Sequence, residues 1–145
     1  MVDVGGKEAG RREAEAEALV RFPPAAFRAL MEGRGPKGAV IEVARLAGIQ
    51  AAKRTADLIP LCHPLALDAV DVRIAADASG APVLRVRCTA SVHARTGVEM
   101  EAMVGAAVAA LTVYDMTKAL DKGISLEAVR LVRKSGGKSG PWAAQ

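Results

Sequence analysis

Aromatic residues are scarce in this chain, and their scarcity argues against one class of function. Phe, Tyr and Trp make up only 3% of the 145 residues, as Phe22, Phe27, Tyr114 and Trp142. Proteins that bind single-stranded nucleic acid stack bases on aromatic side chains, so this composition speaks against that class. Because 51% of the residues are nevertheless hydrophobic, small and aliphatic side chains must build the core. We expect one domain, residues 1–145, with flexible ends at 1–13 and 134–145.

Long apolar runs and an export signal are also lacking. The longest apolar run, residues 102–114, is too short to span a bilayer. No basic segment followed by an apolar one, as in a signal peptide, is visible after Met1. We therefore expect a cytoplasmic protein in which the two cysteines, Cys62 and Cys88, stay as free thiols.

Two familiar ligand-binding patterns are missing as well. Cys62, His63, Cys88 and His93 lack zinc-type spacing, so no metal site is predicted. The tail ends in Gly-Lys-Ser like a P-loop, but Val132 stands where that motif needs its first glycine. The glycine-rich tail, residues 134–140, can still hold phosphate through backbone amides, and it adds two lysines.

The charge that is present favours an anionic partner. Lys and Arg number 20 against 16 Asp and Glu, a net charge of +4. An excess of this size suits either nucleic acid or a phosphorylated small molecule. It does not distinguish between them.

Hydrophobic periodicity predicts an α+β fold. Alternating Ala and Glu over residues 14–22 indicates an edge strand, and the alternation in 70–74 and 84–88 indicates a hairpin. Helices are expected over 24–32, over 40–58 with an apolar face at Val40, Val43, Leu46, Ile49 and Ala52, and over 98–120 with Thr96 as the cap. A last strand is expected over 126–132. This order is typical of the ferredoxin-like sandwich, an antiparallel sheet with helices packed on one face.

Two places carry residues suited to proton transfer. Pro60 and Pro64 exclude helix from the segment that carries His63, so a stiff extended arm is expected to hold its ring in place. A structural, hydrogen-bonded histidine is the alternative. On the last helix, Glu101 and Asp115 end a stripe predicted to be buried, with Lys118 at its edge. An ordinary surface ion pair between Asp115 and Lys118 is the alternative there.

Four motifs resemble one protein family. They are Lys-Arg-Thr-Ala-Asp-Leu-Ile-Pro-Leu-Cys-His-Pro-Leu from residue 53, Thr-Gly-Val-Glu-Met-Glu-Ala from 96, Tyr-Asp-Met-Thr-Lys-Ala from 114 and Lys-Ser-Gly-Gly-Lys-Ser-Gly from 134. In this order they resemble molybdenum cofactor biosynthesis protein C, the cyclic pyranopterin monophosphate synthases. The resemblance implies a lyase that converts 3',8-cyclo-7,8-dihydro-GTP to a cyclic phosphate and releases pyrophosphate. It also implies a ferredoxin-like fold and a hexamer, a trimer of dimers.

The resemblance implies roles for twelve residues of this chain. Catalysis would fall to Lys37, His63, Asp115 and Lys118, and substrate binding to Leu61, Cys62, His63, Glu99, Met100, Glu101, Lys53, Arg12 and Lys134. Cations of this kind suit a triphosphate, and the acids and bases suit ring opening and closure. No cofactor is assigned, and a need for magnesium is left open. The implied sites are shared between subunits, and we expect Lys37 from one chain to meet Asp115 of its neighbour.

The chain departs from the family pattern at one position. Ser91 stands where that pattern has an arginine, which leaves His93 or Arg95 as a replacement phosphate contact. Two other classes stay open from sequence alone. They are a small basic RNA-binding module and an assembly protein without catalytic activity.

Overall fold

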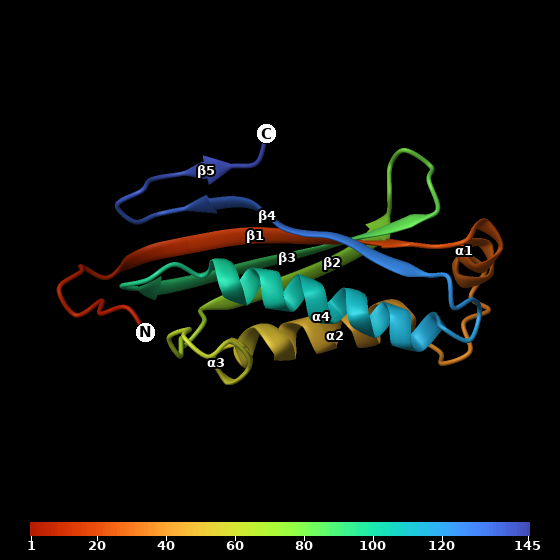
Figure 1. The fold of residues 1–145 in the computed structure, drawn as a ribbon, viewed down its shortest axis with the longest axis horizontal. Helices are drawn as coiled ribbons and strands as arrows, with labels where there is room; N and C mark the ends of the chain where they lie inside the picture. The colour runs from red at the N-terminus through yellow and green to blue at the C-terminus, as the bar shows by residue number, and fades with distance from the viewer.

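The computed structural model describes residues 1–145 as a five-stranded antiparallel sheet with helices over one face (Figure 1). The strands are β1 (Gly10–Arg21), β2 (Ala69–Ala76), β3 (Val83–Ala94), β4 (Ser125–Ser135) and β5 (Trp142–Ala143), in the order β2-β3-β1-β4-β5. The helices are α1 (Pro24–Met31), α2 (Val40–Lys53), α3 (Thr55–Leu58) and α4 (Glu99–Thr117). Setting aside α1, α3 and β5, this is the ferredoxin-like arrangement, and the predicted α+β fold is confirmed.

The first strand lies in the centre of the sheet, so its prediction as an edge strand was wrong. β1 pairs with β3 on one side and with β4 on the other. Its alanines, from Ala14 to Ala18, face the helices and are fully buried. Its glutamates face the other side, where Glu17 is only 1% exposed. The alternation of Ala and Glu did not show that the glutamates are covered, because the arginines that pair with them come from distant parts of the chain.

Those arginines hold the open face of the sheet together. Glu17 accepts hydrogen bonds from Arg130 at 2.7 Å and from Arg85. Arg133 reaches Glu15 at 2.8 Å. Burial alone would raise the pKa of Glu17, but the bonds from Arg130 and Arg85 keep it below its usual value. The three central strands are therefore joined by side-chain ion pairs as well as by backbone hydrogen bonds.

Small residues set the distance between α2 and α4, which lie side by side over the sheet (Figure 1). A Cβ on Gly48 would lie 2.8 Å from the carbonyl oxygen of Gly105, and one on Gly105 would lie 2.5 Å from Cys88 Sγ. Ala106, Ala109 and Ala110 of α4 are fully buried, so this surface of the helix packs closely on its neighbours.

The predicted apolar face of α2 was partly wrong. Val43 and Leu46 are 45% and 57% exposed, whereas Ala44 and Gly48 are buried. The narrow gap against α4 admits only small residues, so the larger side chains turn outward. The helix also ends at Lys53 rather than near residue 58. The hydroxyl of Thr55 then donates to Ala52 O at 3.0 Å beside the break before α3.

The boundaries of the last helix and strand also differ from prediction. No side chain caps α4, so the predicted capping box at Thr96 is wrong, and the helix ends at Thr117 rather than 120. β4 is longer than expected, and β5 was not predicted. Parts of the ends expected to be flexible, Gly10 to Glu13 and Lys134 to Ser135, are strand residues, and their mobility stays a prediction. None of the helices is long and apolar enough to cross a membrane.

We predict that Gly105→Ala destabilises the protein although alanine favours helix. The added methyl would overlap Cys88 Sγ and lie 3.2 Å from the carbonyl oxygen of Gly48, and overpacking of this kind costs about 1–3 kcal/mol. Gly10→Ala is the control, since nothing lies within 4 Å of a Cβ at that position. Urea unfolding of both variants measures the effect. Equal stability of Gly105→Ala and wild type would show that the packing of α4 against Cys88 of β3 can relax.

Candidate functional site

The residues singled out by sequence gather at the two ends of α4. Glu99 and Glu101 lie in its first turn, and Asp115 lies in its last. Sixteen residues of helix separate Glu99 from Asp115, about 24 Å at 1.5 Å per residue. Because α2 and α4 are antiparallel, Lys53 falls at the end that holds Glu101, and Lys37 at the end that holds Asp115.

The Asp115 end is a cluster of three charges. Asp115 Oδ2 accepts a hydrogen bond from Lys37 Nζ at 2.7 Å, and its Oδ1 lies 2.7 Å from Lys118 Nζ. All three side chains are about half exposed. The bonds from Lys118 and Lys37 lower the pKa of Asp115 to about 2, and Asp115 raises the pKa of Lys118. At neutral pH the cluster therefore holds two ammonium groups on one carboxylate.

Lys37 and Asp115 belong to the same chain in this cluster, so the expectation that they come from neighbouring subunits is wrong. The loop before α2 passes beside the end of α4 because these helices run antiparallel. The buried stripe with an acid at each end was also wrong. Glu101 is 4% exposed, but Leu111 is 56% exposed and Asp115 is exposed too.

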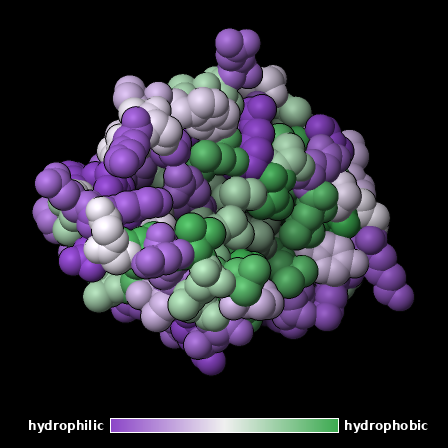
Figure 2. Space-filling view, turned by 60° about the vertical axis from the view of Figure 1, so that its left-hand side comes forward, coloured by the Kyte–Doolittle hydropathy of each residue, from purple (hydrophilic) through white to green (hydrophobic).

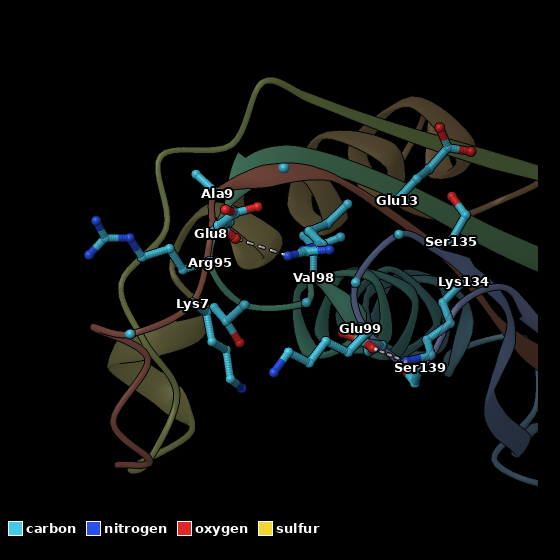
Figure 3. A pocket seen from close by; sticks show the side chains of 18 residues that line it. Lys7, Glu8, Ala9, Glu13, Arg95, Val98, Glu99, Lys134, Ser135 and Ser139 are labelled. Carbon is cyan, nitrogen blue, oxygen red and sulfur yellow. Dashed lines mark hydrogen bonds and ion pairs between the residues drawn. The ribbon is translucent and has the colours of Figure 1, made fainter.

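A polar pocket of about 680 Å³ lies at the other end of α4 (Figure 3). It is lined mainly by charged residues and glycines from the amino-terminal segment, the start of α4 and the glycine-rich tail. Its cations are Lys7, Arg12, Arg95, Lys134 and Lys138, against three acids, Glu8, Glu13 and Glu99. This excess of positive charge suits a ligand with several phosphates.

Glycines allow the tail to close one wall of the polar pocket. Gly136 and Gly137 have φ values of 87° and 82°, which L side chains rarely adopt. A Cβ on Gly136 would collide with the backbone carbonyl of Arg11, and one on Gly137 would lie 2.9 Å from Arg12 Nη1. The tail therefore packs directly on the start of β1, beside the guanidinium of Arg12. Lys134 pairs with Glu99 at 3.3 Å across this wall.

A second pocket, the histidine pocket, adjoins the first and measures about 350 Å³. Its walls include Leu61, Cys62 and His63 from the arm after α3, and Glu99, Met100 and Glu101 from α4. The two segments expected to contact substrate are thus brought together, although 36 positions separate His63 from Glu99. The arm between Pro60 and Pro64 is not helical, as predicted, but it begins with a turn in which Cys62 N donates to Ile59 O at 3.1 Å, so the expectation of a fully extended arm was wrong.

Glu101 is the buried acid of the histidine pocket. It is 4% exposed, and burial raises its pKa above the usual value, with Glu99 adding to the effect. Burial also raises the pKa of Cys62, and the charge of Glu101 contributes to that rise. Cys62 therefore stays a thiol, and Glu101 takes up a proton more readily than an exposed carboxylate does. Such a group can donate a proton to a ligand and recover it.

The remaining predicted residues fall at various distances from these pockets. Arg12 and Lys134 line the polar pocket. Lys53 is exposed at the end of α2 and lines neither pocket. Of the two replacements considered for the missing arginine at Ser91, Arg95 lines the polar pocket and His93 does not. Neither pocket includes any of the Asp115 cluster.

Sequence reasoning assigned no role to Lys7, which lines both pockets. The only feature of the sequence that could have indicated Lys7 is its position directly after Gly5-Gly6. Lys138 was noted as a phosphate-binding candidate only through the tail as a whole, and it also lines the polar pocket. No group of three or more His, Cys, Asp or Glu side chains is placed to hold a metal ion.

The fold and pockets define a class. This is a ferredoxin-like α+β protein with a cation-rich pocket next to a smaller one that holds a histidine and a buried acid, as suits a protein acting on a small phosphorylated molecule. A sequence model of the MoaC family matches residues 1–137. The chain belongs to the MoaC family.

Curated relatives are similar over almost the whole chain. One from Novosphingobium aromaticivorans is 56% identical over 144 residues, which is 99% of this chain and 90% of the relative. Others from Brucella ovis and Brucella melitensis are 54% identical over 143 residues, 99% of this chain and 86% of each relative. All three bear the name cyclic pyranopterin monophosphate synthase.

We predict that Glu101→Gln changes how stability depends on pH. The folded protein holds a proton on Glu101 more tightly than the unfolded chain does, because burial raises the pKa of this group. Its charge therefore costs wild-type stability as pH rises from the unfolded pKa through the raised folded one. Calorimetry gives the melting temperatures of Glu101→Gln and of wild type. The melting temperature of the variant minus that of wild type should become more positive from about pH 4, near the ordinary pKa of glutamate, to about pH 8. A difference that does not vary with pH would mean that Glu101 is solvated.

Proposed function

We propose that this chain is a cyclic pyranopterin monophosphate synthase of molybdenum cofactor biosynthesis. The observation that carries the proposal is the 56% identity to a relative of that name over 99% of the chain. The substrate is a cyclic dihydro-GTP, and the products are cyclic pyranopterin monophosphate and pyrophosphate. The enzyme is accordingly a lyase that breaks a phosphorus–oxygen bond.

The product's cyclic phosphate defines the last step. A hydroxyl oxygen of the intermediate bonds to the α-phosphorus and releases its proton. The bond from that phosphorus to the β-phosphate oxygen breaks, and pyrophosphate leaves with the electron pair. Cations near the leaving group stabilise the charge that develops there. The polar pocket, with Arg12, Lys134 and Lys138, supplies cations of this kind.

We propose that the ring system of the substrate binds in the histidine pocket. Leu61, Cys62 and His63 form one wall and Glu99, Met100 and Glu101 another. Opening a purine-derived ring and closing a pterin ring both require proton transfers. His63 and Glu101 are titratable groups within this pocket. Asp115, Lys37 and Lys118 form a second group of one acid and two bases.

The active site is shared between subunits of a homo-oligomer, which we propose to be a hexamer built from dimers. Fourteen residues of helix separate Glu101 from Asp115, about 21 Å at 1.5 Å per residue, which is too far for both to touch one ring. A neighbouring chain can bring its Asp115 cluster to the histidine pocket. Exposed apolar residues on α2 and α4, including Val43, Leu46 and Leu111, support association. Figure 2 also shows apolar side chains gathered in the middle of the face at the pocket end, with hydrophilic ones around them.

A cytoplasmic location is part of the proposal. Cys62 and Cys88 are free thiols, as expected in a reducing compartment. Burial raises the pKa of Cys88 to about 12, so this thiol is inert.

The decisive experiment is turnover. Wild type incubated with the cyclic dihydro-GTP should release pyrophosphate and form the cyclic monophosphate, detected by a coupled pyrophosphate assay and mass spectrometry. Asp115→Asn and Lys118→Ala should lower the rate by at least 10²-fold, the range of a lost general acid or base. Because these side chains are exposed, both variants should melt close to wild type. Full activity of both variants would mean that Asp115 and Lys118 form only a surface ion pair without a role in catalysis.

Sharing of the site is tested by complementation. His63→Ala and Asp115→Asn chains, each inactive alone, are unfolded, mixed and refolded together. If sites form between chains, random pairing leaves roughly one site in four with both residues intact, and about that fraction of wild-type activity should return. Mass spectrometry verifies mixed oligomers. Mixed oligomers as inactive as their parents would place both residues of a site in one chain.

A further inference from the structure

The last strand, β5, lines neither pocket but pairs with a residue that does. It folds back along the end of β4, with Trp142 opposite Lys134 (Figure 1). Ala144 N then donates to Val132 O at 2.8 Å. The last residue along the chain that lines either pocket is Ser139. Any effect of β5 on a ligand in these pockets must therefore pass through other residues.

This pairing turns the glycine-rich tail into a loop with both ends fixed. Residues 136–141 connect β4 to β5, and Gly140 N donates to Gly137 O at 3.1 Å within the loop. Three of its glycines, Gly136, Gly137 and Gly140, have positive φ. A chain end this rich in glycine has many conformations open to it, so holding it in one costs conformational entropy. Because β5 fixes the far end of the loop, it removes many of these alternatives.

The loop in turn holds the side chain of Lys134. Lys134 Nζ donates to Ser139 Oγ at 2.8 Å and lies 3.3 Å from Glu99 Oε1, so its ammonium group has one partner on the loop and one on α4 (Figure 3). A lysine side chain has several rotatable bonds, and two partners restrict it more than one does. Without the loop in place, only Glu99 would hold this cation, and an ion pair between partly exposed groups contributes little.

We propose that the backbone pairing of β5 with β4 positions Lys134 to bind the pyrophosphate group of the substrate. The proposal rests on the proposed function, in which the cations of the polar pocket receive that group. Trp142 and Ala144 act through their backbone. They fix the loop, the loop places Ser139 beside Lys134, and Lys134 meets the phosphate. The chain end is thus a positioning element and not itself a ligand.

Prolines at alternate positions test the pairing. Along an antiparallel strand, successive N–H groups point toward and away from the partner strand in turn. The N–H of Ala144 faces β4, so that of Trp142 does too, and that of Ala143 faces away. Proline removes an N–H, and an edge strand such as β5 tolerates it only where the N–H faces solvent. The test protein, called the double-proline variant, therefore carries Trp142→Pro and Ala144→Pro, and the matched control is Ala143→Pro.

Titration calorimetry with inorganic pyrophosphate on the full-length protein measures the effect. The double-proline variant should bind pyrophosphate about tenfold more weakly than wild type, as expected when a charged group loses a hydrogen bond, and Ala143→Pro should bind as wild type does. Trp142→Ala removes the indole but keeps the pairing, so it should bind more tightly than the double-proline variant. Unchanged affinity of the double-proline variant would overturn the proposal. Equal weakening by Trp142→Ala or by Ala143→Pro would also overturn it, because the indole or a disturbed chain end, and not the pairing, would then be responsible.

Coupling to Lys134 is measured by combining the double-proline variant with Lys134→Ala. If β5 acts through Lys134, the two prolines should weaken binding no further in that background. The shift of the melting temperature by excess pyrophosphate follows binding that is too weak for calorimetry. A further weakening of the same size would contradict the proposal, because β5 would then act through another residue or through stability as a whole.

Failure of this inference and failure of the proposed function give different results. Release of pyrophosphate by wild type from the cyclic dihydro-GTP, with unchanged binding by the double-proline variant, removes β5 from the site and leaves the enzyme assignment intact. The expected binding pattern without turnover retains β5 as a positioning element of an anion site and removes the synthase assignment. Melting temperatures without ligand should stay close to that of wild type, since β5 is exposed at the chain end. If the double-proline variant does not fold, Ala144→Pro alone should show a smaller loss of the same kind, and unchanged affinity of that variant would overturn the proposal instead.

Discussion

The rest of the structure depends on the central position of β1 and on the two kinds of residue that alternate along it. Its alanines leave room for α4 to approach the sheet closely, and its glutamates receive arginines from both neighbouring strands. Glu17 is almost completely buried, so a charge there is tolerable only because Arg85 and Arg130 hydrogen-bond it. A slip of either neighbouring strand would separate Glu17 from one of these arginines, so the buried carboxylate favours the observed register of the sheet.

The close packing of the helices also depends on small side chains. With few aromatic residues, the core is filled by alanine, valine and glycine, and α2 and α4 meet at Gly48 and Gly105. The antiparallel contact carries the loop with Lys37 to the end of α4, where it meets Asp115. The same contact brings the end of α2 toward the first turn of α4. Packing in the core therefore assembles two separate groups of polar residues, one at each end of the helix layer.

The site is polar where the glycine-rich tail closes it and more apolar where the proline-bounded arm lies. Gly136 permits the tail to touch the backbone of Arg11, so the cations of β1 and the tail converge without a helix to position them. Pro60 and Pro64 keep the arm free of helix beside the start of α4, next to the buried Glu101. Glycine lets the backbone of the tail approach β1 closely in one wall, and proline stiffens the arm in the other. The two walls give a triphosphate and a ring system different surroundings.

The sequence by itself determined the element types, the ferredoxin-like order and the motifs that identify the family, because these depend on local periodicity, turn residues and contiguous residues. It could not place β1 in the centre of the sheet, since the arginines that neutralise Glu15 and Glu17 lie 68 or more positions away, as Arg85 does from Glu17. Nor could it show that Val43 and Leu46 face outward, because helical spacing alone does not reveal how close the neighbouring helix lies. Only the tertiary structure decided that Lys37 meets Asp115 within one chain and that Lys7 stands between two pockets. Contacts of this kind depend on how distant segments pack, and packing is a property of the whole fold.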